Sequence, residues 1–239
     1  MMSPDKILEL LSKNFPINKS LDRQILITAG PTIEPIDPAR FISNRSSGKT
    51  GYAFASVAAK LGAKVVMVSG PTSISPPLGV ETFNVMTAEE MNKKVQSLLT
   101  QNRFDIFIGV AAVADLRPLK ISKSKIKKSE LISKSLKWCR NEDVIANVAK
   151  SNFRPSLVVG FSAETEEVEV NARKKLTEKG LDFICANSIK NGNVFGSDMT
   201  ELMLLGKNQK VVFNHTSKES VAFAILNEIE QYLQGAKNW

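Results

Sequence analysis

The chain has few of the residues on which several common enzyme chemistries depend. Its 239 residues include one histidine, His215, and two cysteines, Cys139 and Cys185. A single histidine excludes multi-histidine metal sites and disfavours a Ser-His-Asp triad, and no Cys-His pair indicates thiol catalysis. We interpret His215 as an ordinary residue at a helix start and Cys185 as a buried thiol. Two cysteines cannot form a disulfide framework, so we expect a reducing, cytoplasmic setting.

Long apolar segments are also missing. The longest, residues 106–114, is far shorter than the ~20 residues that a membrane-spanning helix needs. The first residues lack the apolar core of a signal peptide, so we expect no membrane partner. Hydrophobic residues nevertheless make up 43% of the chain, which is enough for a packed core and excludes a disordered chain.

The positive charge is concentrated in one segment. The net charge is +8, and residues 120–137 alone contain seven lysines and one glutamate. Proteins that bind nucleic acid usually spread basic residues over a face and interleave aromatic side chains, whereas only Trp138 lies near this segment. We therefore predict contact with a small polyanion and no nucleic-acid partner. A solvated lysine-rich loop is the plain alternative.

Short apolar runs alternate with segments of helical spacing along the chain. Strands are predicted at residues 24–28, 64–69, 83–86, 104–113, 131–138, 157–161 and 182–186, a hairpin at 201–213, a long loop at 32–47, and helices at 3–14, 48–61, 87–100, 141–150, 166–179 and 217–233. This alternation predicts an α/β fold, with a mostly parallel Rossmann-like sheet in a three-layer α/β/α arrangement.

The predicted domain organisation is simple. We expect residues 1–23 to form an N-terminal helix and lead-in, and residues 24–239 to form a single α/β domain. Within it, residues 116–138 are expected to form a flexible lysine-rich lid and a small β extension. Ligands of such sheets bind beyond the carboxyl ends of the strands, where this sequence places glycine and polar residues.

The segment Ser-Ser-Gly-Lys-Thr-Gly at residues 46–51 is a candidate anion site. It is not a P-loop, because Ser43 stands where that signature needs a glycine and no clear strand precedes it. Its Ser-Gly turn opens a predicted helix, whose N-terminal amides attract anions. A plain helix cap is the alternative, but the preceding loop carries Arg40, Asn44 and Arg45, which favours the anion site. The glycines do not form a Gly-x-Gly-x-x-Gly fingerprint, so an NAD(P)-binding oxidoreductase has weak support.

Several separated motifs occur in a recognisable order along residues 24–233. They are Ile-Thr-Ala-Gly-Pro-Thr at 27–32, Ile-Ser-Asn-Arg-Ser-Ser-Gly-Lys at 42–49, Ala-Ala-Val-Ala-Asp at 111–115, Lys-Ile-Lys-Lys at 125–128 and Val-Gly-Phe-Ser-Ala-Glu-Thr at 159–165. Together they closely resemble the phosphopantothenoylcysteine synthetases of coenzyme A biosynthesis. Only about two dozen residues precede the first predicted strand, so we expect a monofunctional synthetase, or a separate half with a possible decarboxylase partner.

The resemblance implies a ligase that joins phosphopantothenate to L-cysteine. The carboxylate would attack the α-phosphate of CTP, in preference to ATP, and release pyrophosphate. The cysteine amine would then attack the acyl-nucleotidylate and release CMP. Mg²⁺ would accompany the triphosphate. The family is dimeric through a β extension, for which residues 131–138 and the hairpin at 201–213 are the candidates. An NAD(P)-binding oxidoreductase and a basic polyanion-binding module without catalysis remain the alternatives.

The resemblance also implies residue roles. Asn44 corresponds to the asparagine that holds the acyl-nucleotidylate, and Lys125 to the catalytic lysine of a flexible lid. We predict that Arg40, Asn44 and Arg45 bind substrate. The predicted nucleotide-binding residues are Gly30, Ser46, Gly48, Gly51, Gly109, Val110, Ala111, Asp115, Lys125, Asn141, Glu142, Asp143, Val144, Phe161, Lys175 and Lys179. Metal ligands are not assigned, and departures from the family pattern at Leu116, Glu142 and Ser162 leave the choice of base open.

Overall fold

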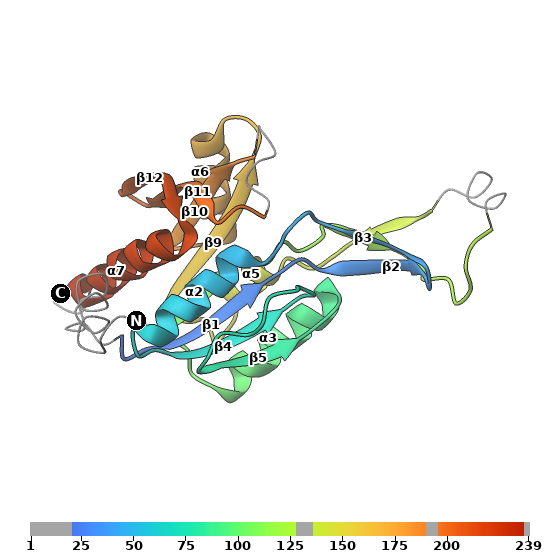
Figure 1. Cartoon of the computed structure of the whole chain (residues 1–239), viewed down its shortest axis with the longest axis horizontal. Helices are drawn as coiled ribbons and strands as arrows, with labels where there is room; N and C mark the ends of the chain where they lie inside the picture. Colours follow the sequence, from blue (N-terminus) through green and yellow to red (C-terminus); the bar gives the residue numbers. More distant parts are fainter. Residues whose placement is uncertain (1–20, 128–135, 190–195, 237–239) are drawn as a thin grey trace, which may run out of the picture.

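An eight-stranded sheet forms the centre of the computed structural model, which describes residues 21–127, 136–189 and 196–236 (Figure 1). Six strands, from β5 to β10 across the sheet, are parallel, and the last two are antiparallel. In spatial order the strands are β12 (Lys210–Ser217), β11 (Met199–Gly206), β10 (Phe183–Ser188), β9 (Leu157–Glu164), β6 (Ile106–Gly109), β1 (Gln24–Ala29), β4 (Lys64–Ser69) and β5 (Val80–Asn84).

Helices cover both faces of this sheet, which confirms the predicted three-layer α/β/α arrangement. One face carries α2 (Lys49–Lys60) and α7 (Lys218–Ala236), which pack against each other (Figure 1). The other carries α3 (Ala88–Gln101), α5 (Val144–Ala149) and α6 (Val168–Lys179). Successive side chains of β1 point to opposite faces of the sheet, and this explains why the core has two layers. Ile25 and Ile27 pack with α2 and α7, whereas Leu26 packs with α3 and α5.

Local sequence signals set the ends of two of these helices. Thr87 and Glu90 form a reciprocal capping box at the start of α3. Gly180 ends α6 in the left-handed conformation, with φ of 68°.

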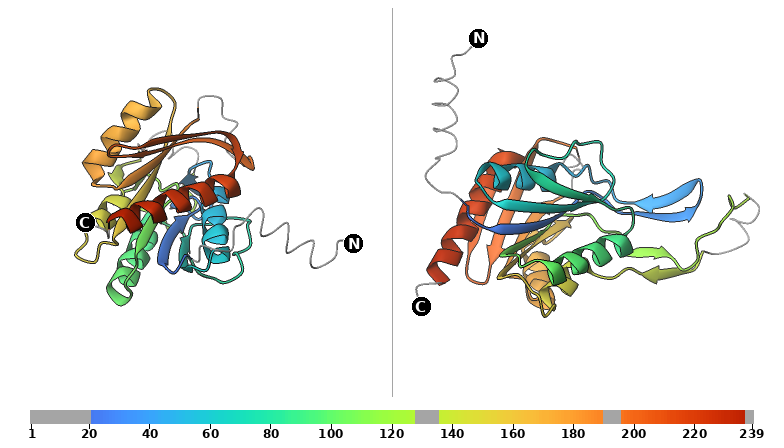
Figure 2. Two further views of the ribbon diagram at one scale, coloured as in Figure 1. Left: turned by 90° about the vertical axis from the view of Figure 1, so that its left-hand side faces the viewer. Right: turned by 90° about the horizontal axis from the view of Figure 1, so that it is seen from below.

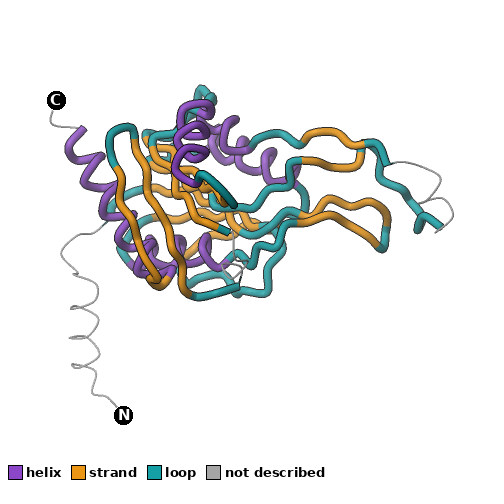
Figure 3. The backbone as a smooth tube through the Cα atoms, turned by 90° about the horizontal axis from the view of Figure 1, so that it is seen from above, coloured by secondary structure: helices purple, strands orange, loops and turns teal. Residues whose placement is uncertain are grey.

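Two antiparallel ribbons project beyond the carboxyl ends of the strands (Figures 2 and 3). We call them the arm, which comprises the described parts of residues 33–43 and 116–140. The first ribbon pairs β2 (Ile33–Asp37) with β3 (Arg40–Ser43), and the second pairs β7 (Leu116–Pro118) with β8 (Trp138–Arg140). The predicted loop at 32–47 is therefore wrong. Pro35 and Pro38 argued against a strand, because proline cannot donate a backbone hydrogen bond inside a sheet. In a two-stranded ribbon both strands are edge strands, where proline is tolerated.

Other predictions also need correction. The hairpin at 201–213 forms the edge of the main sheet rather than a projecting extension. His215 lies in β12 with φ of 40°, not at a helix start. The helix at 3–14 and most of the strand at 131–138 fall outside the described residues. Among the helices that the structure describes, none combines the length and apolar character needed to cross a membrane.

A buried carboxylate joins the two ribbons of the arm. Asp37 accepts hydrogen bonds from the backbone amides of Ala39 and Ile126, at 2.8 and 3.1 Å, and pairs with Arg40 at 2.5 Å. Arg40 also donates to the carbonyl oxygen of Ile126 at 2.7 Å. Burial alone would raise the pKa of Asp37, but the bonds from Arg40 and the two amides lower it to about 2. The arm therefore depends on an ionised Asp37.

We expect the stability contributed by Asp37 to disappear in acid. Because folding lowers its pKa from 3.8 to about 2, this contribution is complete above pH 3.8 and is lost as the pH falls towards 2. The difference in urea midpoint between the protein and an Asp37→Asn variant should therefore shrink across that interval. Asp22→Asn, an exposed change outside the arm, is the control. A constant difference across the interval would contradict this account.

Candidate functional site

A cleft of about 190 Å³ lies at the carboxyl ends of β1, β6 and β9. Its walls come from the start of α2, the segment after β6, the end of β9, and the region where β10 and β11 meet α7. The lining residues are Ser46, Ser47, Gly48, Lys49, Thr50, Gly51, Val110, Ala111, Ala112, Phe161, Ser162, Ala163, Asn187, Gly196, Thr200, Leu202 and Lys218. This is the position at which parallel α/β sheets bind ligands.

The N-terminus of α2 forms one wall of the cleft. Its N-cap residue, Gly48, has φ of 80° and supplies no side-chain cap, and the first turn contains no acidic residue. A Cβ on Gly48 would lie 2.6 Å from the Thr72 side chain, so only glycine fits. The amides of Gly48 and Lys49 make only long hydrogen bonds, to Ser46 Oγ at 3.3 Å and to Ser47 Oγ at 3.5 Å. The positive end of the helix dipole therefore faces the cleft beside two serine hydroxyls, which is an arrangement suited to phosphate.

The segment after β6 is held against the end of β1. Val110 N donates to Thr28 O at 3.1 Å, and Ala112 N donates to Gly30 O at 2.9 Å. Asn44 reaches the same segment from the end of β3, with Nδ2 at 3.1 Å from the oxygen of Ala112 and 3.2 Å from that of Val113. Asn44 is thus an exposed amide fixed directly beside the cleft wall.

Asn141 fixes the continuation of this segment. Its backbone amide donates to Asp115 O at 2.9 Å, and its Nδ2 donates to Ala114 O at 2.8 Å. Arg117 in turn donates to Asn141 Oδ1 at 2.9 Å. These bonds place the exposed Asp115 carboxylate at the base of the arm.

Ion pairs surround the predicted nucleotide lysines on the α5 and α6 side of the sheet. Lys175 lies 2.6 Å from Glu164, and Lys179 lies 2.7 Å from Asp143. Burial opposes ionisation of Asp143, but Lys179 and the Ala146 amide lower its pKa overall. A ligand that uses either lysine must therefore share it with a carboxylate.

A second polar group on this side involves Glu142. Its Oε2 accepts hydrogen bonds from the side-chain amides of Asn92 and Asn147, the second at 3.1 Å. Both asparagines belong to neighbouring helices, so Glu142 connects α3 and α5. These amides orient the carboxylate next to Asp143, whose side chain caps the start of α5.

The structure brings one group of the predicted residues together in the cleft, namely Ser46, Gly48, Gly51, Val110, Ala111 and Phe161. Phe161 packs edge-on against Phe54, with ring centroids 5.5 Å apart. Gly30 and Gly48 are adjacent, since a Cβ on Gly48 would lie 3.4 Å from the Gly30 Cα. Gly109 has a packing reason to be glycine, because a Cβ there would meet Ile145 at 2.6 Å.

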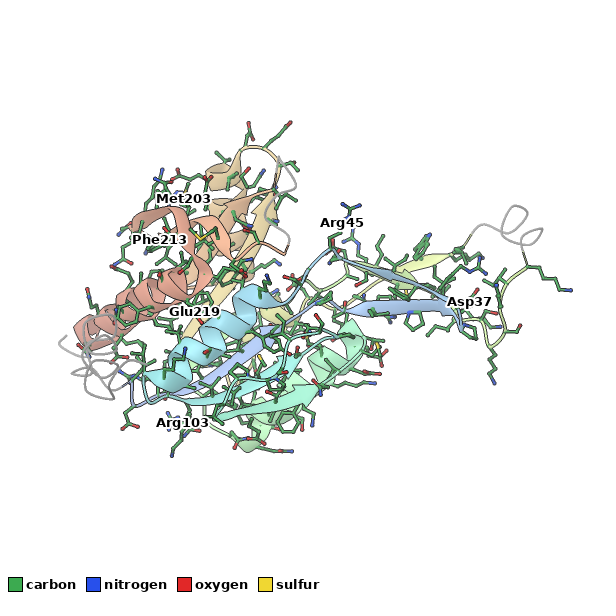
Figure 4. All side chains as sticks on the ribbon, viewed as in Figure 1. Asp37, Arg45, Arg103, Met203, Phe213 and Glu219 are labelled. Carbon is green, nitrogen blue, oxygen red and sulfur yellow. The ribbon has the colours of Figure 1, made fainter. Side chains whose placement is uncertain are left out.

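A second group of predicted residues lies elsewhere. Arg40 contacts Asp37 and Ile126, and Lys125 is the exposed residue before Ile126, so both lie on the arm. Figure 4 shows Asp37 far from the body, while Arg45 is exposed at the root of the arm. Within one copy of the chain, the structure does not bring Arg40 and Lys125 to the cleft. Val144 is the buried first residue of α5 and contributes packing.

Two polar residues of the cleft, Thr200 and Lys218, lie outside the segments that the sequence indicated, whereas Lys49 lies within the predicted anion segment 46–51. Lys49 follows Gly48 directly, so its place beside the anion site was readable from the motif. Lys218 and Thr200 carry no comparable signal, because their approach depends on the antiparallel edge of the sheet. Cys185 is fully buried in β10, and burial raises the pKa of its thiol, as expected for an inert core cysteine.

The described residues contain no group of three or more His, Cys, Asp or Glu side chains that could hold a metal ion. The exposed Asp115 carboxylate at the base of the arm is an oxygen ligand of the kind that Mg²⁺ uses beside phosphate oxygens.

Comparison with known proteins places the chain among proteins of pantothenate metabolism. The model of the DNA/pantothenate metabolism flavoprotein C-terminal domain matches residues 21–233. The chain belongs to this family. Its membership confirms the resemblance that the separated motifs indicated.

The relatives of this family member are longer proteins. The coenzyme A biosynthesis bifunctional protein CoaBC of Vibrio parahaemolyticus is 41% identical over 235 residues, which are 98% of this chain and 58% of that protein. The chain therefore spans little more than half of that relative. The crystal structure of a CoaBC C-terminal domain is 37% identical, with a TM-score of 0.76 over 91% of this chain and all of that one.

A third comparison concerns the fold alone. A Cab2 mutant in complex with phosphopantothenate-cysteine is 15% identical to this chain, with a TM-score of 0.72 over 99% of this chain and 97% of that one. The layered sheet is therefore retained at low sequence identity.

Proposed function

We propose that this chain joins phosphopantothenate to L-cysteine at the expense of a nucleoside triphosphate. The observation that carries the proposal is the start of α2, which has no acidic residue in its first turn and faces a cleft at the carboxyl ends of the sheet in a member of this family. Helix amides bind phosphate without base or sequence requirements. Asn44, beside the cleft wall formed by the segment after β6, supplies an amide that can donate to or accept from a mixed anhydride.

The proposed reaction has two balanced steps. A carboxylate oxygen of phosphopantothenate bonds to the α-phosphorus, and the bond from that phosphorus to the β-phosphate oxygen breaks, which releases pyrophosphate. The cysteine nitrogen then bonds to the acyl carbon, the acyl carbon–oxygen bond breaks, CMP leaves and the amine loses a proton. Both nucleophiles belong to substrates, so a chain with one histidine and a buried thiol in β10 can perform the reaction.

CTP is the nucleotide that we propose, with Mg²⁺ bound to its phosphates. The metal would neutralise phosphate charge. The cytosine base would be bound by residues near α5 and α6, where hydrogen bonds hold the side chains of Asp143 and Glu142 in place. We further propose that the protein works in the cytoplasm, with a separate decarboxylase as a possible partner.

The arm supports a homodimer. Its exposed side chains include large apolar residues, namely Phe41, Leu116, Leu119, Ile121 and Trp138. An exposed apolar surface of this kind is normally covered by a partner, and a two-fold dimer covers the same surface on both copies. Because Arg40 and Lys125 lie on the arm, a second copy would bring them to a cleft that their own copy does not supply.

A two-stage assay tests the proposed function. Protein, phosphopantothenate, CTP and MgCl₂ should release pyrophosphate, and addition of L-cysteine should then produce CMP and the amide in equal amounts. ATP in place of CTP tests the choice of base. Absence of the amide with either nucleotide would remove the proposal, whereas NADH fluorescence changes on binding would support an oxidoreductase.

Lys125→Gln is expected to lower the kcat of amide formation by about 10- to 100-fold, the range expected for a lost charged hydrogen bond. The melting temperature should stay unchanged because Lys125 is exposed. Lys127→Gln, an exposed change two residues away, is the matched control. Equal kinetics for the two variants would exclude a role for Lys125.

A further inference from the structure

Two lysines occupy the end of the cleft nearest α7, and neither has a role in the reaction described so far. Lys49 is the first residue of α2, and Lys218 is the first residue of α7. Both line the cleft, and both also line a neighbouring cavity of about 520 Å³ beside Tyr52 and Ile74. The two lysines therefore border both cavities.

The contacts of these lysines converge on one short segment, residues 196–198. Lys49 Nζ donates to Gly196 O at 2.6 Å and to Asp198 Oδ1 at 2.7 Å. Lys218 Nζ donates to Ser197 O, and Lys218 N donates to Asp198 O at 3.0 Å. Each ammonium group has three donors, so these bonds leave donors for a further ligand.

Among the described residues, a single carboxylate, that of Asp198, is available to balance the charges of Lys49 and Lys218. Within the described part of the chain, Asp198 is the carboxylate in contact with Lys49, and Lys218 forms no salt bridge. Lys218 is only 7% exposed, and burial lowers its pKa, as does the charge of Lys49, while Asp198 raises it. Glu219 also lines the second cavity but lies 3.9 Å from Lys60. A positive charge therefore remains uncompensated at a buried position, which favours an anion.

Asp198 is suited to be displaced. Its side chain is 85% exposed, so it regains water when it releases Lys49, and exposed pairs of this type contribute little stability. Lys49 then needs only to rotate its side chain towards the cleft, because its backbone already belongs to the first turn of α2. The ammonium of Lys218 is held in place by the Ser197 carbonyl.

We infer that Lys49 and Lys218 bind the β- and γ-phosphates of the nucleotide, and the pyrophosphate that leaves, by exchange for Asp198. This subsite rests on the proposed function for its position in the reaction. The helix amides at Gly48 would hold the phosphate next to the reacting carboxylate, and the two lysines would hold the departing part. Pyrophosphate and the terminal phosphates of CTP share the chemistry that the lysines recognise.

Calorimetric titration of the intact protein with inorganic pyrophosphate, CTP and CMP tests this subsite. Lys49→Gln and Lys218→Gln should each lower the affinity for pyrophosphate and for CTP by about tenfold. The affinity for CMP should fall much less, because CMP lacks the terminal phosphates. Lys64→Gln removes the same charge from an exposed position at the start of β4, outside both cavities, and should leave all three affinities unchanged. Circular dichroism checks that each variant is folded.

Asp198→Asn keeps the test valid if Lys218→Gln does not fold. This exposed substitution should free Lys49 and strengthen pyrophosphate binding about three- to tenfold, because the competing carboxylate is gone. Unchanged pyrophosphate affinity in both Lys49→Gln and Asp198→Asn would overturn the inference, and so would an equal loss for CMP and pyrophosphate. Failure of the ligase assay with the wild-type chain would remove the proposed function alone, because these titrations need no turnover.

Discussion

Asn44→Ala is expected to reduce the kcat of amide formation by about 100- to 1000-fold, the effect of removing one hydrogen-bond donor from a developing oxyanion. The side chain lies where β3 meets the segment after β6, and its Nδ2 is within 3.2 Å of two carbonyl oxygens there. Alanine removes the hydrogen bonds to these carbonyl oxygens. It also removes the amide that we propose binds the acyl-nucleotidylate. Because Asn44 is exposed, the fold should survive.

The decisive measurement for Asn44 separates the two half-reactions. Pyrophosphate release in the absence of cysteine should fall, or the intermediate should hydrolyse, so that pyrophosphate exceeds the amide formed. Asn152→Ala changes an exposed asparagine in the turn before β9 and is the control. Wild-type kinetics for Asn44→Ala would remove this residue from the site.

Gly70→Ala is expected to lower the free energy of unfolding by roughly 3 kcal/mol, at the upper end of the cost of overpacking. A Cβ at this position would lie 1.7 Å from the carbonyl oxygen of Pro31, which is backbone and cannot rotate away. Pro31 follows Gly30 at the end of β1, so the forced shift would also disturb the cleft. The melting temperature should fall by about 6–12 °C for a chain of this size.

Gly235→Ala is the matched substitution for Gly70. A Cβ on Gly235 meets nothing within 4 Å in the described structure, and the residue belongs to α7. Alanine should raise the free energy of unfolding by up to about 1 kcal/mol, because it favours helix over the unfolded chain. Thermal unfolding of both variants gives the comparison, and a Gly70→Ala protein as stable as the wild type would show that Pro31 moves freely.

The sequence was sufficient for the layers of the fold and for the part of the cleft at the start of α2. Buried parallel strands such as β4 read as continuous apolar runs, and the Thr87 capping box marks α3 without tertiary information. The segment at 46–51 was predicted as an anion site because the helix start and its Ser-Gly turn are neighbours in sequence. The structure places these residues in one cleft with Val110 and Phe161.

The arm and the α7 end of the cleft could not be predicted in the same way. The ribbon of β2 and β3 is held by Asp37, whose partner Ile126 is 89 residues away in the chain. Lys218 meets the cleft only because β11 and β12 turn back along the sheet edge. Such contacts depend on three-dimensional packing, whereas residue patterns report only neighbours along a strand or helix.

The placement of Cys185 matters for a protein that we propose handles a thiol substrate. Its side chain in β10 is fully buried, and burial raises the pKa of the thiol, so the thiol stays protonated. It therefore cannot undergo thiol–disulfide exchange with free cysteine or cystine. The other thiol, Cys139, sits in β8 and donates to Arg117 O at 3.6 Å. A mixed disulfide can therefore form only at Cys139 on the arm. Cys185 in β10 does not react when cysteine in the surroundings becomes oxidised.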